Sequence, residues 1–145
     1  MEAMPTYDEL QQRIKDLEQK EIKHRQAEEA LQQSEERYRS LVENTIYGYF
    51  IHDIPSGRFL FFNQRARELF GHTMKEGLKL TVWDVLSPED HEHIKRRVQA
   101  RVEGNRLGPD IQTYTALRKD GSTFRLEVSS SLIAFQGEPA VQGVF

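Results

Sequence analysis

The densest group of side chains that could do chemistry is Asp90-His91-Glu92-His93. Carboxylates and imidazoles are ligands that zinc and other divalent metals accept, and histidine also transfers protons near neutral pH. The group opens a predicted helix, on which residues two apart point to different sides. The two imidazoles are therefore badly placed to share one ion. We expect no metal site here and interpret the segment as a solvated first helical turn.

The sequence contains none of the residue patterns typical of nucleotide binding or covalent catalysis. Neither G-x-G-x-x-G nor G-x-x-x-x-G-K-[ST], the glycine-rich motifs that cradle phosphates, is present. The chain has no cysteine, which removes thiolate nucleophiles, disulfides and Cys-ligated metals. We therefore expect that this chain is not an enzyme.

The total charge argues against two classes of partner. With 20 Lys and Arg against 23 Asp and Glu, the net charge is −3, which does not favour nucleic acid or anionic membrane as a partner. The basic run Lys95-Arg96-Arg97 is accordingly expected to be a solvated helix face. No apolar run approaches the about 20 residues that cross a bilayer, and the first residues lack a secretory signal. We expect a cytoplasmic protein.

The elements that must position these residues fall into two parts, 1–44 and 45–145. The first part has 11 acids, 7 bases and no glycine, and good helix formers dominate it. It predicts one long helix from about residue 6 to residue 43. Side chains of one seam recur along it at steps of four and three, as in a coiled coil, with Ala27 and Ser34 on the seam beside six larger apolar side chains: Leu10, Ile14, Leu17, Leu31, Tyr38 and Leu41.

Such a helix has too few apolar positions to be stable alone in water, because most helix stability comes from packing one face. We therefore expect a parallel homodimer through those six side chains. Glu21 and His24 interrupt the apolar seam, so its middle should be weak. The alternative is a partly disordered tail whose last turns alone dock on the following domain.

The second part contains 12 of the 14 aromatic residues and favours the α+β class. Aromatic-rich runs at 47–53 and 58–63 predict a hairpin, 63–72 a short helix, and 81–104 the longest helix of the domain, with Ser87-Pro88 at its start. Segments 111–118, 123–133 and 140–145 predict three antiparallel strands, with a turn at 136–139 before the last one. The chain stops within the last of these strands, so we expect a fragment of a longer protein.

Five segments in this order resemble PAS domains of the sensory-box type. They are S-E-E-R-Y-R-S-L-V-E-N-T (34–45), G-Y-F-I-H-D (48–53), P-S-G-R-F-L-F-F-N-Q-R-A-R-E-L-F-G (55–71), D-V-L-S-P-E-D-H (84–91) and R-K-D-G-S-T-F-R-L-E-V-S-S-S (118–131). The resemblance covers residues 34–145. It implies a five-stranded antiparallel sheet with helices on one face and a small cavity beneath them, usually in dimeric signalling proteins with an N-terminal helix.

The resemblance also implies a sensory or regulatory module of a signal-transduction protein. It favours a sensor histidine kinase as the parent, with the module binding a small ligand or mediating dimerisation and signal relay. One alternative is a passive relay domain whose core is filled by its own side chains, and another is the input domain of a diguanylate cyclase. Cavity volume separates ligand binding from passive relay, because ligand pockets measure about 300 Å³ or more.

Family geometry would place Phe50 and His52 on the cavity side of the first strand. His52 could hydrogen-bond a polar ligand or change charge near pH 6.5, whereas the alternative is a histidine bonded to neighbouring backbone or to Tyr114. Asn63 has a simpler alternative role as a helix cap. The candidate pocket residues are Phe50, His52, Phe61, Asn63, Phe70, Trp83, Ile94, Val98, Tyr114, Leu126 and Val128.

The cofactor, if any, is left open by the sequence. Photosensors of this family bond flavin to a cysteine, and the absence of cysteine excludes that subclass. Haem-binding relatives place a histidine on the long helix facing the cavity. His91 and His93 precede the expected cavity-facing stripe of Ile94 and Val98, so haem is not expected.

Overall fold

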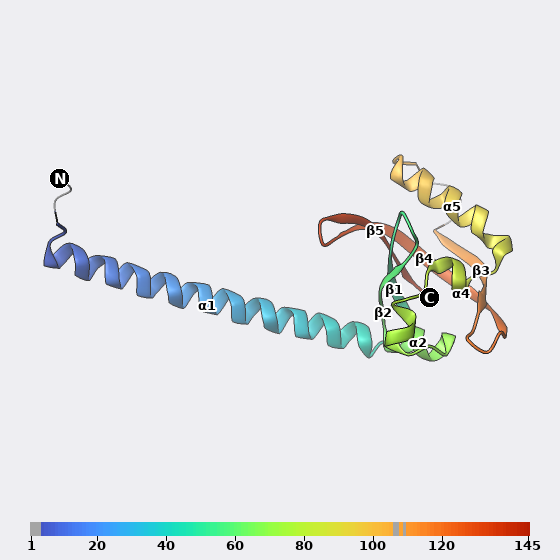
Figure 1. Cartoon of the computed structure of the whole chain (residues 1–145), viewed down its shortest axis with the longest axis horizontal. Helices are drawn as coiled ribbons and strands as arrows, with labels where there is room; N and C mark the ends of the chain where they lie inside the picture. The colour runs from blue at the N-terminus through green and yellow to red at the C-terminus, as the bar shows by residue number, and fades with distance from the viewer. Residues whose placement is uncertain (1–3, 106–107, 109) are drawn as a thin grey trace. The chain divides into compact units, whose positions relative to one another are not determined.

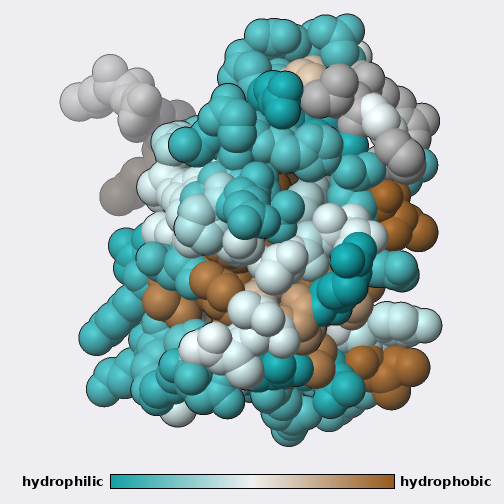
Figure 2. All heavy atoms as spheres, turned by 90° about the vertical axis from the view of Figure 1, so that its right-hand side faces the viewer, coloured by the Kyte–Doolittle hydropathy of each residue, from teal (hydrophilic) through white to brown (hydrophobic). Residues whose placement is uncertain are grey.

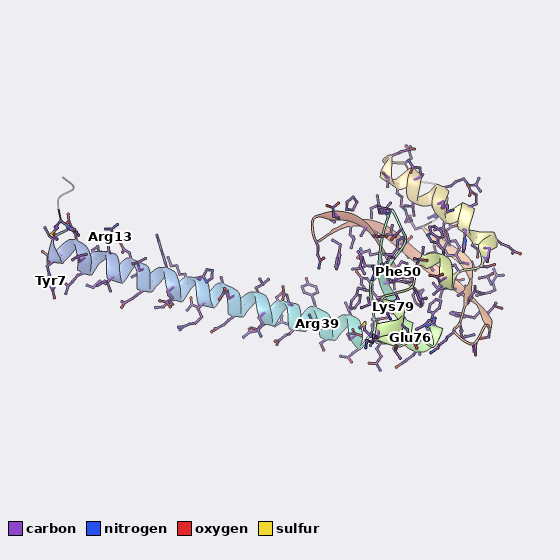
Figure 3. The ribbon with its side chains drawn as sticks, viewed as in Figure 1. Tyr7, Arg13, Arg39, Phe50, Glu76 and Lys79 are labelled. Carbon is purple, nitrogen blue, oxygen red and sulfur yellow. The ribbon has the colours of Figure 1, made fainter. Side chains whose placement is uncertain are left out.

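The computed structural model describes residues 4–105, 108 and 110–145, and backbone contacts divide the chain into units 1–41 and 42–145. Helix α1 (Tyr7–Glu43) accounts for nearly all of the first unit, so the predicted long helix is confirmed. It begins with a reciprocal cap in which Thr6 and Glu9 each accept a backbone N–H from the other. Every residue from Tyr7 to Leu41 is exposed, and the side chains point outward all round the helix (Figure 3).

The second unit is built on one five-stranded antiparallel sheet (Figure 1). Its spatial order is β2-β1-β5-β4-β3, with every neighbouring pair antiparallel. The strands are β1 (Tyr49–Asp53), β2 (Phe59–Phe62), β3 (Ile111–Leu117), β4 (Thr123–Phe135) and β5 (Glu138–Val144). Between β2 and β3 come α2 (Gln64–Phe70), α3 (Met74–Gly77), α4 (Val82–Val85) and α5 (Pro88–Val102). The predicted α+β fold with a five-stranded sheet is confirmed.

The start of α5 follows the expected chemistry. Ser87 is the N-cap residue and Pro88 occupies the first helical position, where its missing N–H costs nothing. Just before it, Leu86 is extended and forms an isolated bridge with Ala116 of β3. This contact ends α4 and separates it from α5, so 81–104 contains two helices.

The core lies between the sheet and the short helices. Phe70 of α2, Val82 and Val85 of α4, and Ile94 of α5 meet side chains of β3 and β4, all nearly inaccessible to solvent. On the face shown in Figure 2, hydrophilic side chains predominate and hydrophobic ones form separate patches. Among the helices in the described ranges, none is long and apolar enough to cross a membrane.

Candidate ligand cavity

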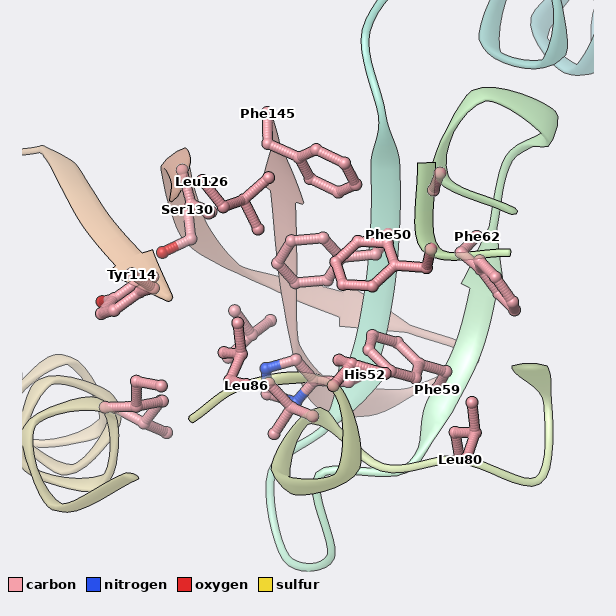
Figure 4. A pocket seen from close by; sticks show the side chains of 18 of the residues that line it. Phe50, His52, Phe59, Phe62, Leu80, Leu86, Tyr114, Leu126, Ser130 and Phe145 are labelled. Carbon is pink, nitrogen blue, oxygen red and sulfur yellow. The ribbon is translucent and has the colours of Figure 1, made fainter. Parts of the chain in front are cut away.

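A cavity of about 70 Å³ lies within unit 42–145, beneath the helices and against one face of the sheet (Figure 4). Eight of the eleven candidate pocket residues line it: Phe50, His52, Phe70, Ile94, Val98, Tyr114, Leu126 and Val128. Further lining residues that the sequence did not suggest are Phe59, Phe62, Arg97, Arg101, Ser130 and Phe145. Phe61, Asn63 and Trp83 do not line it.

Phe61 lies on the opposite face of the sheet because it pairs with Ile51, which also does not line the cavity, and an irregularity follows between Phe61 and Phe59. Phe62 pairs with Phe50 and Phe61 with Ile51, but Phe59 pairs with His52, so Leu60 is an extra residue. Such a bulge reverses the alternation of side chains along the strand. Phe59 and Phe62 therefore both reach the cavity, whereas Phe61 packs 5.9 Å from Tyr49, measured between ring centroids.

Asn63 is fully buried and has a structural role. Its side-chain oxygen accepts hydrogen bonds from Tyr49 N (2.9 Å) and Ala66 N (3.0 Å), the second of which caps α2. Its amide nitrogen donates to Val42 O (2.7 Å) and Tyr47 O (2.9 Å). This one side chain thus joins the start of β1, the start of α2 and the segment that begins at Val42.

Trp83 of α4 lies outside the cavity, half-buried against the edge of the core. Its indole N–H donates to Ser56 O at 3.0 Å, and its ring packs against His91 and beneath the ammonium group of Lys95. These contacts hold the β1–β2 turn against α4. The tryptophan is therefore a structural residue of that turn.

His52 is the histidine whose environment is most altered by folding. It is 4% exposed, stacks on Phe50, and its Nδ1 lies 2.7 Å from Asp53 O. Since a carbonyl oxygen only accepts, Nδ1 carries the proton and Nε2 is an acceptor. Burial lowers the pKa of His52, and the contact with Asp53 offsets this only in part. The lowered pKa favours the neutral ring at pH 7, and its backbone contact matches one of the two alternatives foreseen for it.

The α5 side of the cavity is basic. Arg97 was expected on a solvated helix face, but it is 5% exposed and lines the cavity. Arg101, four residues further on the same face, also lines it and donates to Ser130 Oγ at 2.7 Å. Burial raises the pKa of the Tyr114 hydroxyl, and the positive charges of Arg97 and Arg101 oppose that rise. Lys95 and Arg96 are exposed as expected, but the expectation was wrong for Arg97, because Arg97 lies on the helical stripe of Ile94 and Val98.

The two histidines of α5, His91 and His93, point elsewhere. Nε2 of His91 lies 2.9 Å from Leu86 O, and Nε2 of His93 lies 3.0 Å from Gln112 Oε1. In the part of the chain that the structure describes, no three His, Asp or Glu side chains are grouped closely enough to hold a metal ion. Neither histidine is placed to bind an occupant of the cavity.

The volume limits what the cavity can hold. It is well below the about 300 Å³ at which drug-sized pockets begin. A buried water needs about 10–15 Å³ of such space, so roughly five to seven water-sized groups fit. The arrangement therefore suits a small molecule that has an apolar part and a polar group.

Comparisons with known proteins agree with this geometry. The sequence profile of the PAS-fold family matches residues 36–145. Sporulation kinase A of Bacillus subtilis is 30% identical over 113 residues, which are 77% of this chain and 18% of that protein. The methyl sulfide methyltransferase-associated sensor of Methanosarcina acetivorans is 27% identical over 124 residues, 85% of this chain and 12% of that protein. The chain thus spans less than a fifth of either relative.

A solved structure shows the same fold. The PAS domain of an HTR-like protein from Haloarcula marismortui superimposes with a TM-score of 0.68 at 22% identity, covering 83% of this chain and 96% of that one. The sheet, the helices and the matched profile lead to one assignment. This chain belongs to the PAS-fold family and is a sensory domain related to those of sensor histidine kinases.

Proposed function

We propose that this chain is the input module of a sensor histidine kinase and that it binds a small ligand in its cavity. The observation that carries the proposal is space of about 70 Å³, bordered by His52 and Arg97, inside an otherwise buried core. Protein interiors are close-packed, with few voids larger than a water molecule. A ligand that fits one arrangement of the sheet better than another would shift the population between them.

A passive relay domain is the second candidate, and a specific observation favours it. The cavity, lined by the rings of Phe50, Phe59, Phe62 and Phe145 among others, measures about 70 Å³, which is smaller than ordinary ligand pockets. In this case the interior needs no ligand. Signal would pass only through the sheet and the attached helix.

Ligand screening by NMR separates the two candidates. ¹H–¹⁵N spectra of the full chain would be recorded with a metabolite set restricted to about seven non-hydrogen atoms, the size that the cavity admits. Ligand sensing predicts saturable shifts at Val128 and Phe145 and at their cavity neighbours. A set that leaves these signals unmoved would favour passive relay.

The same proposal includes a parallel homodimer formed by α1. All six seam side chains are exposed to solvent, with exposed fractions from 44% for Leu10 to 69% for Tyr38. A partner helix could bury this apolar surface. Ile22, also exposed, adds an apolar group that the heptad pattern did not include. Pairing two copies along the seam would bury this surface and bring two domains to matched ends of a coil.

Sedimentation of full-length variants tests the dimer. Leu17→Asp combined with Leu31→Asp should convert a dimer at tens of micromolar to a monomer, because charged groups would enter the seam. Gln19→Asp, off the seam, is the control. A fragment starting at Ser34 should also be monomeric. If the wild-type chain is a monomer at this concentration, α1 is not a dimerisation element.

We infer a kinase output from the similarity to sporulation kinase A, and the full-length parent protein is needed to test it. A histidine kinase should transfer phosphate from ATP to its own histidine, whereas a diguanylate cyclase should consume GTP. Labelled ATP and GTP added to the purified parent distinguish these activities directly.

A further inference from the structure

The imidazole of His52 is held in one orientation at the wall of the cavity (Figure 4). It stacks on Phe50, with ring centroids 5.8 Å apart and an angle of 8° between the ring planes. The ring of Phe59 lies 6.4 Å away and nearly perpendicular to it, at 88°. Nδ1 lies 2.7 Å from Asp53 O, so the ring cannot turn without losing this hydrogen bond. These contacts also fix the direction of the second ring nitrogen, Nε2.

Nε2 of His52 is a hydrogen-bond acceptor that faces the cavity. Nδ1 holds the proton of the neutral ring, so Nε2 carries a lone pair. None of the described residues donates to it, yet every fully enclosed side-chain nitrogen or oxygen atom in the described part of the chain has a partner. Nε2 must therefore face open space. Because His52 is 4% exposed and lines the cavity, that space is the cavity.

The arginines of the cavity wall already have protein partners. Arg97 forms a hydrogen bond with Tyr114, Arg101 donates to Ser130 Oγ at 2.7 Å, and both arginines have further interactions with the chain. An anion in the cavity would have to compete with these partners. Burying a charged ligand that lacks a partner of its own is costly, so the cavity favours a neutral ligand.

Most of the remaining wall is hydrocarbon. Phe59, Leu80 and Val82 are among the apolar side chains that line the cavity. His72, the other histidine of the wall, lies against the carboxylate of Glu76, with 3.7 Å between Nδ1 and Oε2. The cavity thus combines a largely apolar surface with one acceptor, Nε2 of His52, whose position the protein fixes.

We propose that this cavity binds a short aliphatic alcohol, whose hydroxyl group donates a hydrogen bond to Nε2 of His52 and whose chain lies among the apolar side chains. The inference rests on the proposed ligand-sensing function and names the class of ligand. An alcohol supplies the donor that Nε2 lacks, whereas an ether or a hydrocarbon of the same size would leave this nitrogen without one. Space for roughly five to seven water-sized groups admits alcohols of up to about five carbon atoms.

NMR titration of the full chain with two isomers tests the inference. The probes are n-butanol and methyl propyl ether, which contain the same atoms, although only the alcohol has an O–H donor. For so few ligand atoms, we expect a dissociation constant for n-butanol between about 0.1 and 10 mM. The ether should bind at least about fivefold more weakly, because it cannot donate to Nε2. Sodium butyrate, the charged analogue, should also bind at least about fivefold more weakly than n-butanol.

The nitrogen resonances of the histidine side chains report the contact itself. In long-range ¹H–¹⁵N spectra of the full chain, saturating n-butanol should move the Nε2 resonance of His52 upfield, as expected for a lone pair that accepts a hydrogen bond. Methyl propyl ether should not cause this shift. His24, exposed on α1, is the internal reference and should not respond to either probe.

Variants test whether His52 causes the preference for the alcohol. His52→Phe keeps an aromatic ring beside Phe50 but removes the acceptor, so n-butanol and the ether should bind equally. Comparing the two isomers in the same variant cancels any change in the size of the cavity. His24→Gln is the matched control and should keep the preference for n-butanol. The fluorescence of Trp83, the single tryptophan, reports whether each variant is folded. If His52→Phe does not fold, the isomer pair and the Nε2 shift in the wild-type chain decide.

The outcomes separate this inference from the function on which it rests. A preference for n-butanol over the ether, with the Nε2 shift, supports the alcohol assignment. Equal binding of the isomers, preferential binding of butyrate, or a preference that persists in folded His52→Phe overturns the assignment and leaves ligand sensing in place. If none of the three probes binds but the metabolite screen finds another ligand, the alcohol assignment alone is overturned. If that screen is also negative, ligand sensing is overturned with it.

Discussion

Residues 7–41 and residues 42–145 use their apolar side chains in opposite ways. In α1 the leucines and isoleucines of the seam remain in contact with solvent, whereas in the second unit Phe70, Ile94 and Leu126 are removed from it. Burial of a large apolar side chain contributes about 1.5–3 kcal/mol. The second unit therefore carries the source of its stability within itself, and α1 does not.

Polar contacts follow the same division. Within residues 7–41, side-chain hydrogen bonds such as Gln12 with Asp16 and Gln32 with Glu36 join residues four apart. Such pairs contribute about 0.2–0.5 kcal/mol each. In the second unit Asn63 instead connects Val42, Tyr47 and Tyr49, which are distant in sequence. Local contacts can bias a helix, but only the distant ones fix a tertiary structure.

The largest expected effect is the loss of a core side chain. Leu126→Ala should lower the free energy of unfolding of the domain by about 3 kcal/mol, because it deletes buried methyl groups beside an existing cavity. Leu31→Ala in α1 should change it by less than about 0.5 kcal/mol. Urea denaturation followed by Trp83 fluorescence measures both. Equal effects of the two substitutions would mean that α1 packs on the domain, contrary to the comparison.

The next effect concerns Asn63. Asn63→Ala should lower the free energy of unfolding by about 2–3 kcal/mol, since it leaves buried backbone groups without partners. Asn63→Asp should also destabilise, because a carboxylate cannot donate to Val42 O and Tyr47 O. The control is Gln64→Ala, one residue away and exposed, with an expected change under about 0.5 kcal/mol. A loss in the Asn63 variants no larger than in this control would contradict the proposed role.

Much of the fold was accessible from the sequence because its signals are local. Periodicity predicted α1, Ser87-Pro88 predicted the start of α5, and alternation of apolar residues predicted β4. The junction at Asn63 was also visible as a helix cap. Its bonds to Val42 and Tyr47 were not, since they depend on how distant segments meet.

The cavity residues also divide into those that local sequence patterns predict and those that depend on contacts between distant segments. Leu126 and Val128, which strand alternation selected, line the cavity, whereas Phe61 pairs with Ile51 and does not. The extra residue Leu60 in β2 turns Phe59 towards the cavity as well. A bulge shows itself only in the pairing with a neighbouring strand, so the sequence of one strand does not reveal it. Arg97 and Arg101 could have been found, because they share the helical stripe of Ile94 and Val98.

The third prediction compares one histidine from each region. Burial lowers the pKa of His52, so the unfolded chain takes up a proton near pH 6.5 while the folded chain does not. The stability of the domain should therefore fall as the pH decreases below about 6.5, with a slope from this group that approaches about 1.4 kcal/mol per pH unit. The slope ends below the folded-state pKa.

Urea unfolding between pH 7.5 and pH 5 isolates this effect. His52→Gln should remove this part of the pH dependence, whereas His24→Gln, on the exposed surface of α1, should leave the slope unchanged. If wild-type chain and His52→Gln show the same slope, His52 does not remain neutral in the folded domain. This result would show whether a buried histidine of the domain affects the pH dependence of stability while an exposed histidine of α1 does not.

The smallest expected effect lies on the surface of the domain, where a charge still depends on a tertiary contact. Lys119 Nζ donates to Glu76 Oε1 at 2.7 Å, and this contact, with the backbone N–H of Thr73, lowers the pKa of Glu76 to about 2. Because the folded-state pKa is depressed, this contribution to stability is present above the unfolded pKa of 4.5 and is lost as the pH falls towards 2.

A ¹³C NMR titration of the Glu76 carboxylate should show a midpoint near 2 that rises towards 4.5 in Lys119→Gln. Lys79→Gln, a nearby exposed lysine (Figure 3), should leave the midpoint in place. A midpoint unaffected by Lys119→Gln would mean that the cap of α3 and His72, both close in sequence, set the pKa of Glu76, and the domain surface would then resemble residues 7–41, whose contacts are local.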